Sequence, residues 1–197
     1  AAERGRTLSV VGAFSPDETG RLLRDPGVSA AGLAALEALR DGSARPLLPF
    51  VATDGLVRKA AFAASVQGLA PRLSGLPDAG LLPVPLRFHL AGEAERCAAR
   101  GERILARLAR LRGLLSEEGI RAVPLKGAAL LVRRDVPAGL RPMADIDLLM
   151  ESEADLQRAA GKIGKAMEYR PLWNTRRHLV LGERRERVAL WACEHPE

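Results

Sequence analysis

Leucine and alanine recur at helical spacing through the first half of the chain. Leucines three residues apart between Ser29 and Gly42 predict one helix, because side chains at this spacing share a helix face. A second helix is predicted from a cap at Thr53 to Gly68. Residues 71–85 contain four prolines and two glycines, a composition that predicts a linker.

A long apolar stripe follows this linker. Within residues 86–115, apolar positions recur in steps of three, four or seven, which fits one buried helix face. Gly92 and Gly101 are expected to divide the stretch into two helices. We therefore predict a mostly helical N-terminal region, residues 1–84, and a second domain, residues 85–197.

The final third of the chain changes to short strands. The predicted elements are, in order, a strand at 120–125, a helix at 127–133, a Pro/Gly loop at 135–143, a strand at 144–150, a helix behind a capping Ser152, and strands at 178–181 and 187–191 around a turn at Gly182. A further short strand is predicted at 8–11. Aromatic residues make up only 4% of the chain. This composition favours helices packed on a small sheet, so we predict an α+β fold.

The charge of the chain permits anionic partners without choosing among them. The net charge is +6, and the 30 basic residues are 26 arginines and 4 lysines. Arginine is therefore a general habit of this chain, whereas each lysine is unusual. Five arginines form a stripe on the long helix: Arg96, Arg100, Arg103, Arg107 and Arg110. The stripe is typical of a solvated helix face, and contact with a nucleic-acid backbone is the alternative.

Several classes of protein find no support in the sequence. No apolar run approaches the roughly 18 residues that a membrane span needs, and no Gly-x-Ser-x-Gly motif of a serine hydrolase occurs. Cys97 and Cys193 are far apart, which indicates two reduced thiols. We expect a cytoplasmic protein without a membrane partner. Trp173, Trp191 and His178 are assigned structural roles.

The triplet Asp145-Ile146-Asp147 is the most informative chemical feature. Residues two apart in a strand point to the same face, so both carboxylates are expected to project together. Two like charges held side by side repel, and a divalent cation relieves that repulsion. Mg²⁺ commonly binds through one or two carboxylates together with substrate phosphates. The alternative is a strand end with two solvated acids.

A second feature precedes these acids by about 18 residues. Lys126, Gly127 and Ala128 lie where a predicted strand turns into a helix, a geometry that presents backbone N–H groups to a phosphate. Lys126 adds a positive charge suited to phosphate. Arg141, just before the acidic strand, could contact a triphosphate or pair with a local acid. The turn that could bind phosphate and the pair of acids together indicate a nucleotide site.

These two segments carry a resemblance to a known family. Residues 123–130 read Val-Pro-Leu-Lys-Gly-Ala-Ala-Leu, and residues 140–149 read Leu-Arg-Pro-Met-Ala-Asp-Ile-Asp-Leu-Leu. The pattern resembles the uncharacterised nucleotidyltransferase family of the DNA polymerase beta-like nucleotidyltransferase superfamily, best over residues 85–170. The resemblance implies a mixed sheet flanked by helices. It also implies a glycine turn that binds the triphosphate, and Mg²⁺ (or Mn²⁺) on Asp145 and Asp147.

The sequence departs from that pattern in two respects. The superfamily usually has Gly followed by Gly or Ser at the turn, where this chain has Lys126-Gly127-Ala128. The superfamily also supplies a third carboxylate from a later strand, of Val-Glu-Leu-His type in this family. No such strand is recognised here, and Glu194 is the possible substitute. We therefore expect the chain to end before its third acid.

Three functions remain open from the sequence. The first is an enzyme that transfers a nucleoside monophosphate from an NTP, expected to be ATP, to an acceptor. That acceptor could be a small molecule, a protein side chain or an RNA end. The second is a catalytically silent module that binds nucleotide or protein. The third is a basic helical protein that binds nucleic acid through the arginine stripe.

Overall fold

The computed structural model describes residues 14–193 except 134–136, 138, 139, 141, 144, 184 and 185. Contacts group the chain into two units, Ala1–Cys97 and Ala98–Glu197, and each has its own hydrophobic core. The domain boundary predicted after residue 84 stays a prediction, because a contact grouping does not define a segment that folds alone. The strand predicted at 8–11 lies outside the described residues.

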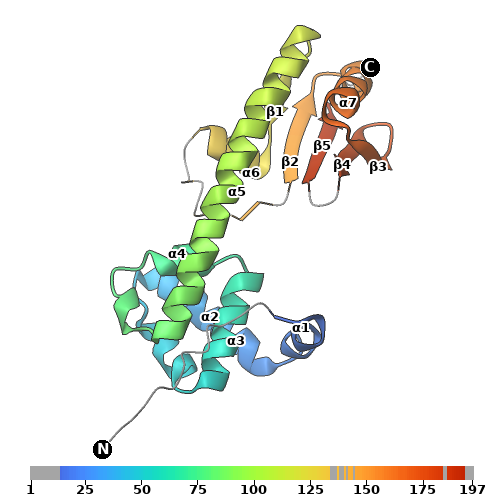
Figure 1. Ribbon diagram of the computed structural model, residues 1–197. Helices are drawn as coiled ribbons and strands as arrows, with labels where there is room; N and C mark the ends of the chain where they lie inside the picture. The colour runs from blue at the N-terminus through green and yellow to red at the C-terminus, as the bar shows by residue number, and fades with distance from the viewer. Residues whose placement is uncertain are drawn as a thin grey trace, which may run out of the picture. The chain divides into compact units, whose positions relative to one another are not determined.

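The first unit is helical (Figure 1). Its elements are α1 (Pro16–Leu22), α2 (Pro26–Asp41), η1 (Arg45–Val51), α3 (Asp54–Val66), α4 (Ala70–Ser74), η2 (Ala79–Leu81) and the beginning of α5 (Val84–Glu117). Many of its buried residues are alanines, whose small side chains allow helices to approach closely. The Thr53 cap predicted for the second helix is confirmed, since its side chain accepts a hydrogen bond from the Leu56 N–H.

Two predictions for this unit were wrong. Helix α2 begins at Pro26 rather than near Ser29, because the Asp25 side chain accepts a hydrogen bond from the Gly27 N–H and Pro26 suits a first helical turn. The segment predicted as a linker contains α4 and η2. Pro71 lies in the first turn of α4, where the missing N–H of proline breaks no hydrogen bond.

Helix α5 runs unbroken for 34 residues, contrary to the predicted division at Gly92 and Gly101. A glycine inside a helix costs about 1 kcal/mol, and a long buried stripe offsets that cost. Leu86 and Leu90 belong to the first core, whereas Leu111 and others nearer the C-terminal end of α5 belong to the second. No described helix is long and apolar enough to cross a membrane.

The second unit contains a five-stranded sheet in its described part, with strand order β1-β2-β5-β4-β3 (Figure 1). The strands are β1 (Ala122–Pro124), β2 (Asp145–Met150), β3 (Arg170–Asn174), β4 (His178–Glu183) and β5 (Glu186–Ala192). Strand β2 is parallel to β5, and the other neighbouring pairs are antiparallel. The sheet is therefore mixed, which confirms the predicted fold class of a small mixed sheet with helices and a helical N-terminal region.

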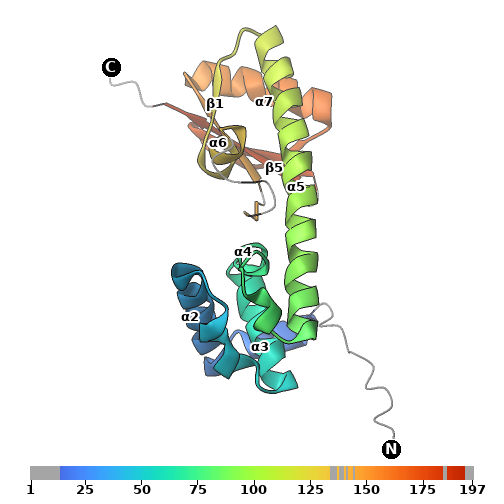
Figure 2. The same cartoon turned by 90° about the vertical axis from the view of Figure 1, so that its left-hand side faces the viewer.

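Helices α5 and α7 (Glu153–Met167) contribute to the core of this unit together with the sheet. Figure 2 shows α7 passing beside the last turns of α5, where Arg110 of α5 donates to the Ala166 carbonyl at 2.8 Å. Ile146 and Met150 of β2 are fully buried in the same core. Because side chains alternate along a strand, Asp145, Asp147 and Leu149 face the other side of the sheet. That second face carries the predicted site.

Candidate functional site

Strand β2 carries both predicted acids on one face. Asp145 and Asp147 flank Ile146, which is 0% exposed and anchors the strand in the core. The alternation of a strand therefore directs both carboxylates away from that core. Asp145 is exposed to solvent, whereas Asp147 is only 5% exposed. A buried carboxylate needs compensation by hydrogen bonds or charge.

Asp147 receives this compensation from two side chains. The Lys126 ammonium lies 2.9 Å from Asp147 Oδ1, and the Trp191 indole donates to the same oxygen at 3.1 Å. Lys126 Nζ also lies 5.2 Å from the centre of the Trp191 ring. We call Lys126, Asp147 and Trp191 the Asp147 cluster. It joins three elements, α6 (Lys126–Val132), β2 and β5.

Lys126 reaches Asp147 because the turn before α6 is bonded to β2. The Leu125 N–H donates to the Asp147 carbonyl at 2.9 Å, which places the next residue beside the strand. Lys126 has φ +50°, a left-handed conformation that is uncommon for residues other than glycine. Gly127 and Ala128 are buried in the first turn of α6. The structure thus brings the predicted turn and Asp147 together.

The residue beside Asp147 on the neighbouring strand β5 is Ala189. Strand β5 pairs with β2 in parallel register, and Asp147 lies directly opposite Ala189. Residues in register share a face of the sheet, so this position is adjacent to the Asp147 carboxylate. Alanine supplies no carboxylate at this position. The described part of the chain contains no cluster of three or more Asp, Glu, His or Cys side chains that could hold a metal.

The expectation that the chain ends before the strand of the third acid stays a prediction. Strand β5 lies beside β2, on the side away from β1. Residues 188–191 read Val-Ala-Leu-Trp and match the Val-Glu-Leu-His pattern at the first and third positions. Ala189 and Trp191 stand where that pattern has its acid and its histidine. Glu194 and Arg141 lie outside the described residues.

Sequence reasoning gave structural roles to two residues that border this site. His178 of β4 lies opposite Trp191, and their rings stack with centres 3.7 Å apart and planes 10° from parallel. Its Nε2 is buried, and no described group forms a hydrogen bond with it. His178 therefore supports the indole that donates to Asp147. The residue spacing alone holds no signal for this, because the contact depends on strand pairing.

The two carboxylates suit one divalent cation. Mg²⁺ prefers oxygen ligands, keeps several waters and usually binds through one or two carboxylates with substrate phosphates. Asp145 and Asp147 provide such a pair of ligands, provided that Lys126 leaves the carboxylate it now contacts. A cation at this site has no carboxylate ligand from position 189, because Ala189 stands beside Asp147. Asp145 and Asp147 could thus serve together as ligands of one cation.

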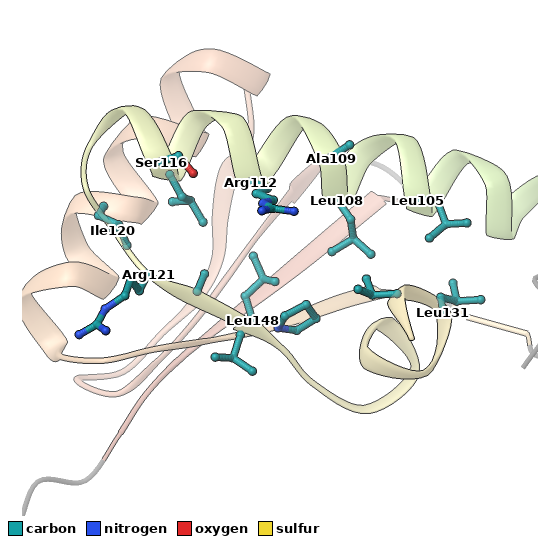
Figure 3. Close-up of a pocket in the computed structure, with 14 residues that line it drawn as sticks. Leu105, Leu108, Ala109, Arg112, Ser116, Ile120, Arg121, Leu131 and Leu148 are labelled. Carbon is teal, nitrogen blue, oxygen red and sulfur yellow. The ribbon is translucent and has the colours of Figure 1, made fainter. Parts of the chain in front are cut away.

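A pocket of about 820 Å³ lies on the other side of β2 (Figure 3). Leu105 and Leu108 of α5 point into it, opposite Leu131 of α6 and Leu148 of β2. Leu148 is next to Asp147 in a strand and therefore faces the opposite side of the sheet. The pocket is thus separate from the Asp147 cluster, and the sequence did not predict it.

The arginine stripe is partly engaged within the chain. Arg96 pairs with Glu93 at 2.6 Å, Arg100 donates to the Met143 carbonyl at 3.3 Å, and Arg110 bonds the Ala166 carbonyl. The Arg96 contact lies within α5, and the contacts of Arg100 and Arg110 join α5 to other segments of the second unit. They give no particular support to the nucleic-acid alternative, which requires arginines free to follow a phosphate backbone.

Comparison with known proteins identifies a family. The model of the family described as "Uncharacterised nucleotidyltransferase" matches residues 53–190. The matched segment contains α3, all of α5, and the whole described sheet apart from the end of β5. It therefore includes the Asp147 cluster apart from Trp191, which immediately follows its last residue. No curated protein matches the chain.

Proposed function

Because this chain belongs to the uncharacterised nucleotidyltransferase family, we propose that it transfers a nucleoside monophosphate from an NTP to an acceptor. Family membership supports nucleotidyl transfer in general. The observation that carries the finer proposal is the position of Asp145 and Asp147 on one face of β2, beside the turn that contains Lys126. ATP is the proposed donor. The acceptor is a small molecule, a protein side chain or an RNA end, in the cytoplasm.

The proposed roles follow from the positions of the side chains. Asp145 and Asp147 would hold Mg²⁺ or Mn²⁺ together with the triphosphate. When bound, this cation neutralises phosphate charge and orients the reacting phosphorus. Lys126 supplies a positive charge to the phosphates, and Gly127 with Ala128 offers the backbone of the turn. Arg141 is proposed to contact the same triphosphate.

The proposed reaction divides the triphosphate of the donor between two products. An acceptor oxygen forms a bond to the α-phosphorus, the bond from that phosphorus to the oxygen bridging the α- and β-phosphates breaks, and pyrophosphate leaves. The acceptor also loses a proton. In a three-acid site the third carboxylate could take it, but Ala189 offers no such group. Proton removal in this chain therefore falls to solvent or to the substrate.

The same observation favours a second candidate function. With alanine beside Asp147 and with Lys126 already bonded to it, the site can hold a nucleotide without the group that activates an acceptor. The chain would then be a catalytically silent module that binds nucleotide or a partner protein. A silent module that binds nucleotide agrees with the transferase on nucleotide binding and differs from it in turnover, whereas one that binds only a partner protein differs in both.

Label transfer from NTPs separates the candidates. The protein is incubated with α-labelled NTPs and Mg²⁺ or Mn²⁺, and pyrophosphate release and nucleotide binding are both measured. Under the first proposal, Asp145→Asn and Asp147→Asn each reduce turnover by at least about 100-fold, because a metal contact contributes several kcal/mol to the transition state. Asp54→Asn, an exposed acid at the start of α3, serves as the matched control.

Each outcome decides between the candidates. Turnover that requires both acids supports the transferase. Nucleotide binding without pyrophosphate release supports the silent module. Binding and turnover that ignore both Asp→Asn changes contradict both candidates, because the acid pair would then have no role at the site.

A further inference from the structure

Lys126 occupies the contact that a divalent cation would need. Its ammonium and the Trp191 indole both bond Oδ1 of Asp147, the buried member of the acid pair. We propose that Lys126 is a switch: in the free protein it holds Asp147, and on binding a triphosphate it moves to the phosphates, so that cation and nucleotide bind together. This inference rests on the proposed nucleotide site and adds a coupling that the family assignment does not contain.

The exposure of the two partners allows such a movement. The Asp147 side chain is 7% exposed and fixed in β2, whereas the Lys126 side chain is 62% exposed. Ion pairs between solvent-exposed side chains are worth less than about fivefold in an equilibrium constant, and the Lys126 end of this pair is exposed to solvent. A triphosphate offers a lysine several charged oxygens instead of one. Lys126 can therefore exchange partners while Asp147 stays in place.

The charges of the site explain why the exchange couples the two ligands. The Lys126 ammonium cancels one of the two carboxylate charges, and Arg187 lies opposite Asp145 in register, so the free site attracts a divalent cation only weakly. When the ammonium leaves Asp147, one more negative charge becomes available to the cation. Triphosphate binding should therefore raise the affinity for the cation. By linkage, the cation raises the affinity for triphosphate by the same factor.

The backbone at this position also indicates a role for the lysine side chain. Lys126 has φ +50°, a conformation that glycine adopts without steric cost. A residue needed only for the turn would be glycine, and a side chain held in this conformation is often functional. Lys126 is also one of only four lysines in the chain. The side chain at residue 126 is thus inferred to be required for its charge.

The test is Mn²⁺ binding without nucleotide, measured by electron paramagnetic resonance on the whole chain. Lys126→Met removes the ammonium and keeps an unbranched stem. Lys126→Gly removes it and suits the backbone, so it guards against a folding defect in the first variant. Lys165→Met is the matched control, because it removes one charge from an exposed lysine of α7. Circular dichroism verifies that all variants are folded.

Both Lys126 variants are expected to bind Mn²⁺ about fivefold more tightly than the wild type and the Lys165→Met control, because one nearby positive charge is removed. The gain should vanish when Asp147→Asn is added. Mn²⁺ binding that requires Asp147 but is equal in wild type and both Lys126 variants overturns the switch and leaves the proposed site intact. Absence of Mn²⁺ binding from every variant, both without and with a nucleoside triphosphate, overturns both.

Trp191 supplies a second readout in a Trp173→Phe background. Trp173 is 59% exposed and lies in β3, so its removal leaves one reporter beside Lys126. Inorganic tripolyphosphate without metal should change Trp191 emission in this background, because the ammonium leaves the ring. The change should be absent with Lys126→Met and present with Lys165→Met. An equal response with Lys126→Met contradicts the proposed movement.

Discussion

At the scale of single residues, Asp147 combines burial with a negative charge. Its carboxylate is compensated by the Lys126 ammonium and the Trp191 indole N–H, and neither residue belongs to the hydrophobic core. Replacement of a buried hydrogen-bonding partner leaves the other partner unsatisfied, at a cost of about 1–3 kcal/mol. The residues around Asp147 therefore determine both its stability and what it can bind.

Ala189 provides the most direct residue-scale prediction. Ala189→Glu places a second carboxylate beside Asp147 at a position that is 5% exposed. In the absence of metal we expect a loss of about 1–3 kcal/mol in the free energy of unfolding, because the new charge is poorly solvated and repelled by Asp147. Added Mn²⁺ should recover much of this loss. Urea denaturation with and without Mn²⁺ measures both effects.

Ala189→Gln is the matched control, because it adds a side chain of the same length without the charge. It should lose stability by overpacking and show no recovery with Mn²⁺. An equal Mn²⁺ response in the Gln and Glu variants would show that the position does not face the acid pair.

At the scale of elements, ion pairs join the end of α5 to α7. Lys162 of α7 lies 2.8 Å from Glu118 and 3.2 Å from Glu117. The hydrogen bond from Lys162 lowers the pKa of Glu118 below its ordinary value of 4.5. A lowered pKa stabilises the folded state above pH 4.5, and this contribution is lost as the pH falls through the folded-state value.

Lys162→Met should therefore change how stability depends on pH. We expect it to lower the urea midpoint at pH 7 and to flatten the fall in stability below pH 4.5, because Glu118 then titrates near its ordinary pKa. Lys165→Met, in the same helix, should leave the shape of the pH profile unchanged. Parallel profiles for wild type and Lys162→Met would contradict the role given to this ion pair.

Local sequence signals predicted the elements that depend on local chemistry. The cap at Ser152 is confirmed, since its hydroxyl accepts from the Asp155 N–H at 3.1 Å, and the acidic strand is confirmed as β2. Strand β3 was missed because all five of its residues are exposed and show no apolar alternation. The unbroken α5 was missed because tertiary burial outweighs the two glycines that argue for a break.

The residues of the candidate site also divide into those recognised from local sequence and those that depend on strand pairing. The acid pair and the lysine turn were recognised from short segments, and the structure places Lys126 against Asp147. Ala189 and Trp191 were not recognised, because they approach Asp147 only through the parallel pairing of β2 with β5. Parallel pairing links strands that are far apart in sequence, so no local pattern encodes it. The roles of the site residues stay predictions.

At the scale of the whole molecule, the chain has two hydrophobic cores. One is built from residues of the first unit, and the other from the sheet, α7 and the C-terminal part of α5. Every described residue of the candidate site belongs to the second unit. A ligand stabilises the part of a protein that it binds, so its effect reveals whether the two cores respond separately.

Hydrogen exchange with mass spectrometry tests this separation. A nucleoside triphosphate with Mn²⁺ at about 100 times its dissociation constant stabilises the bound state by about 2.7 kcal/mol. We expect exchange in β2 and β5 to slow by up to about 100-fold, while exchange in α2 and α3 changes little. Asp147→Asn should abolish the slowing. Equal slowing in α2 and β2 would instead show that the two cores unfold as one cooperative unit, because a ligand held by the second unit would then protect both.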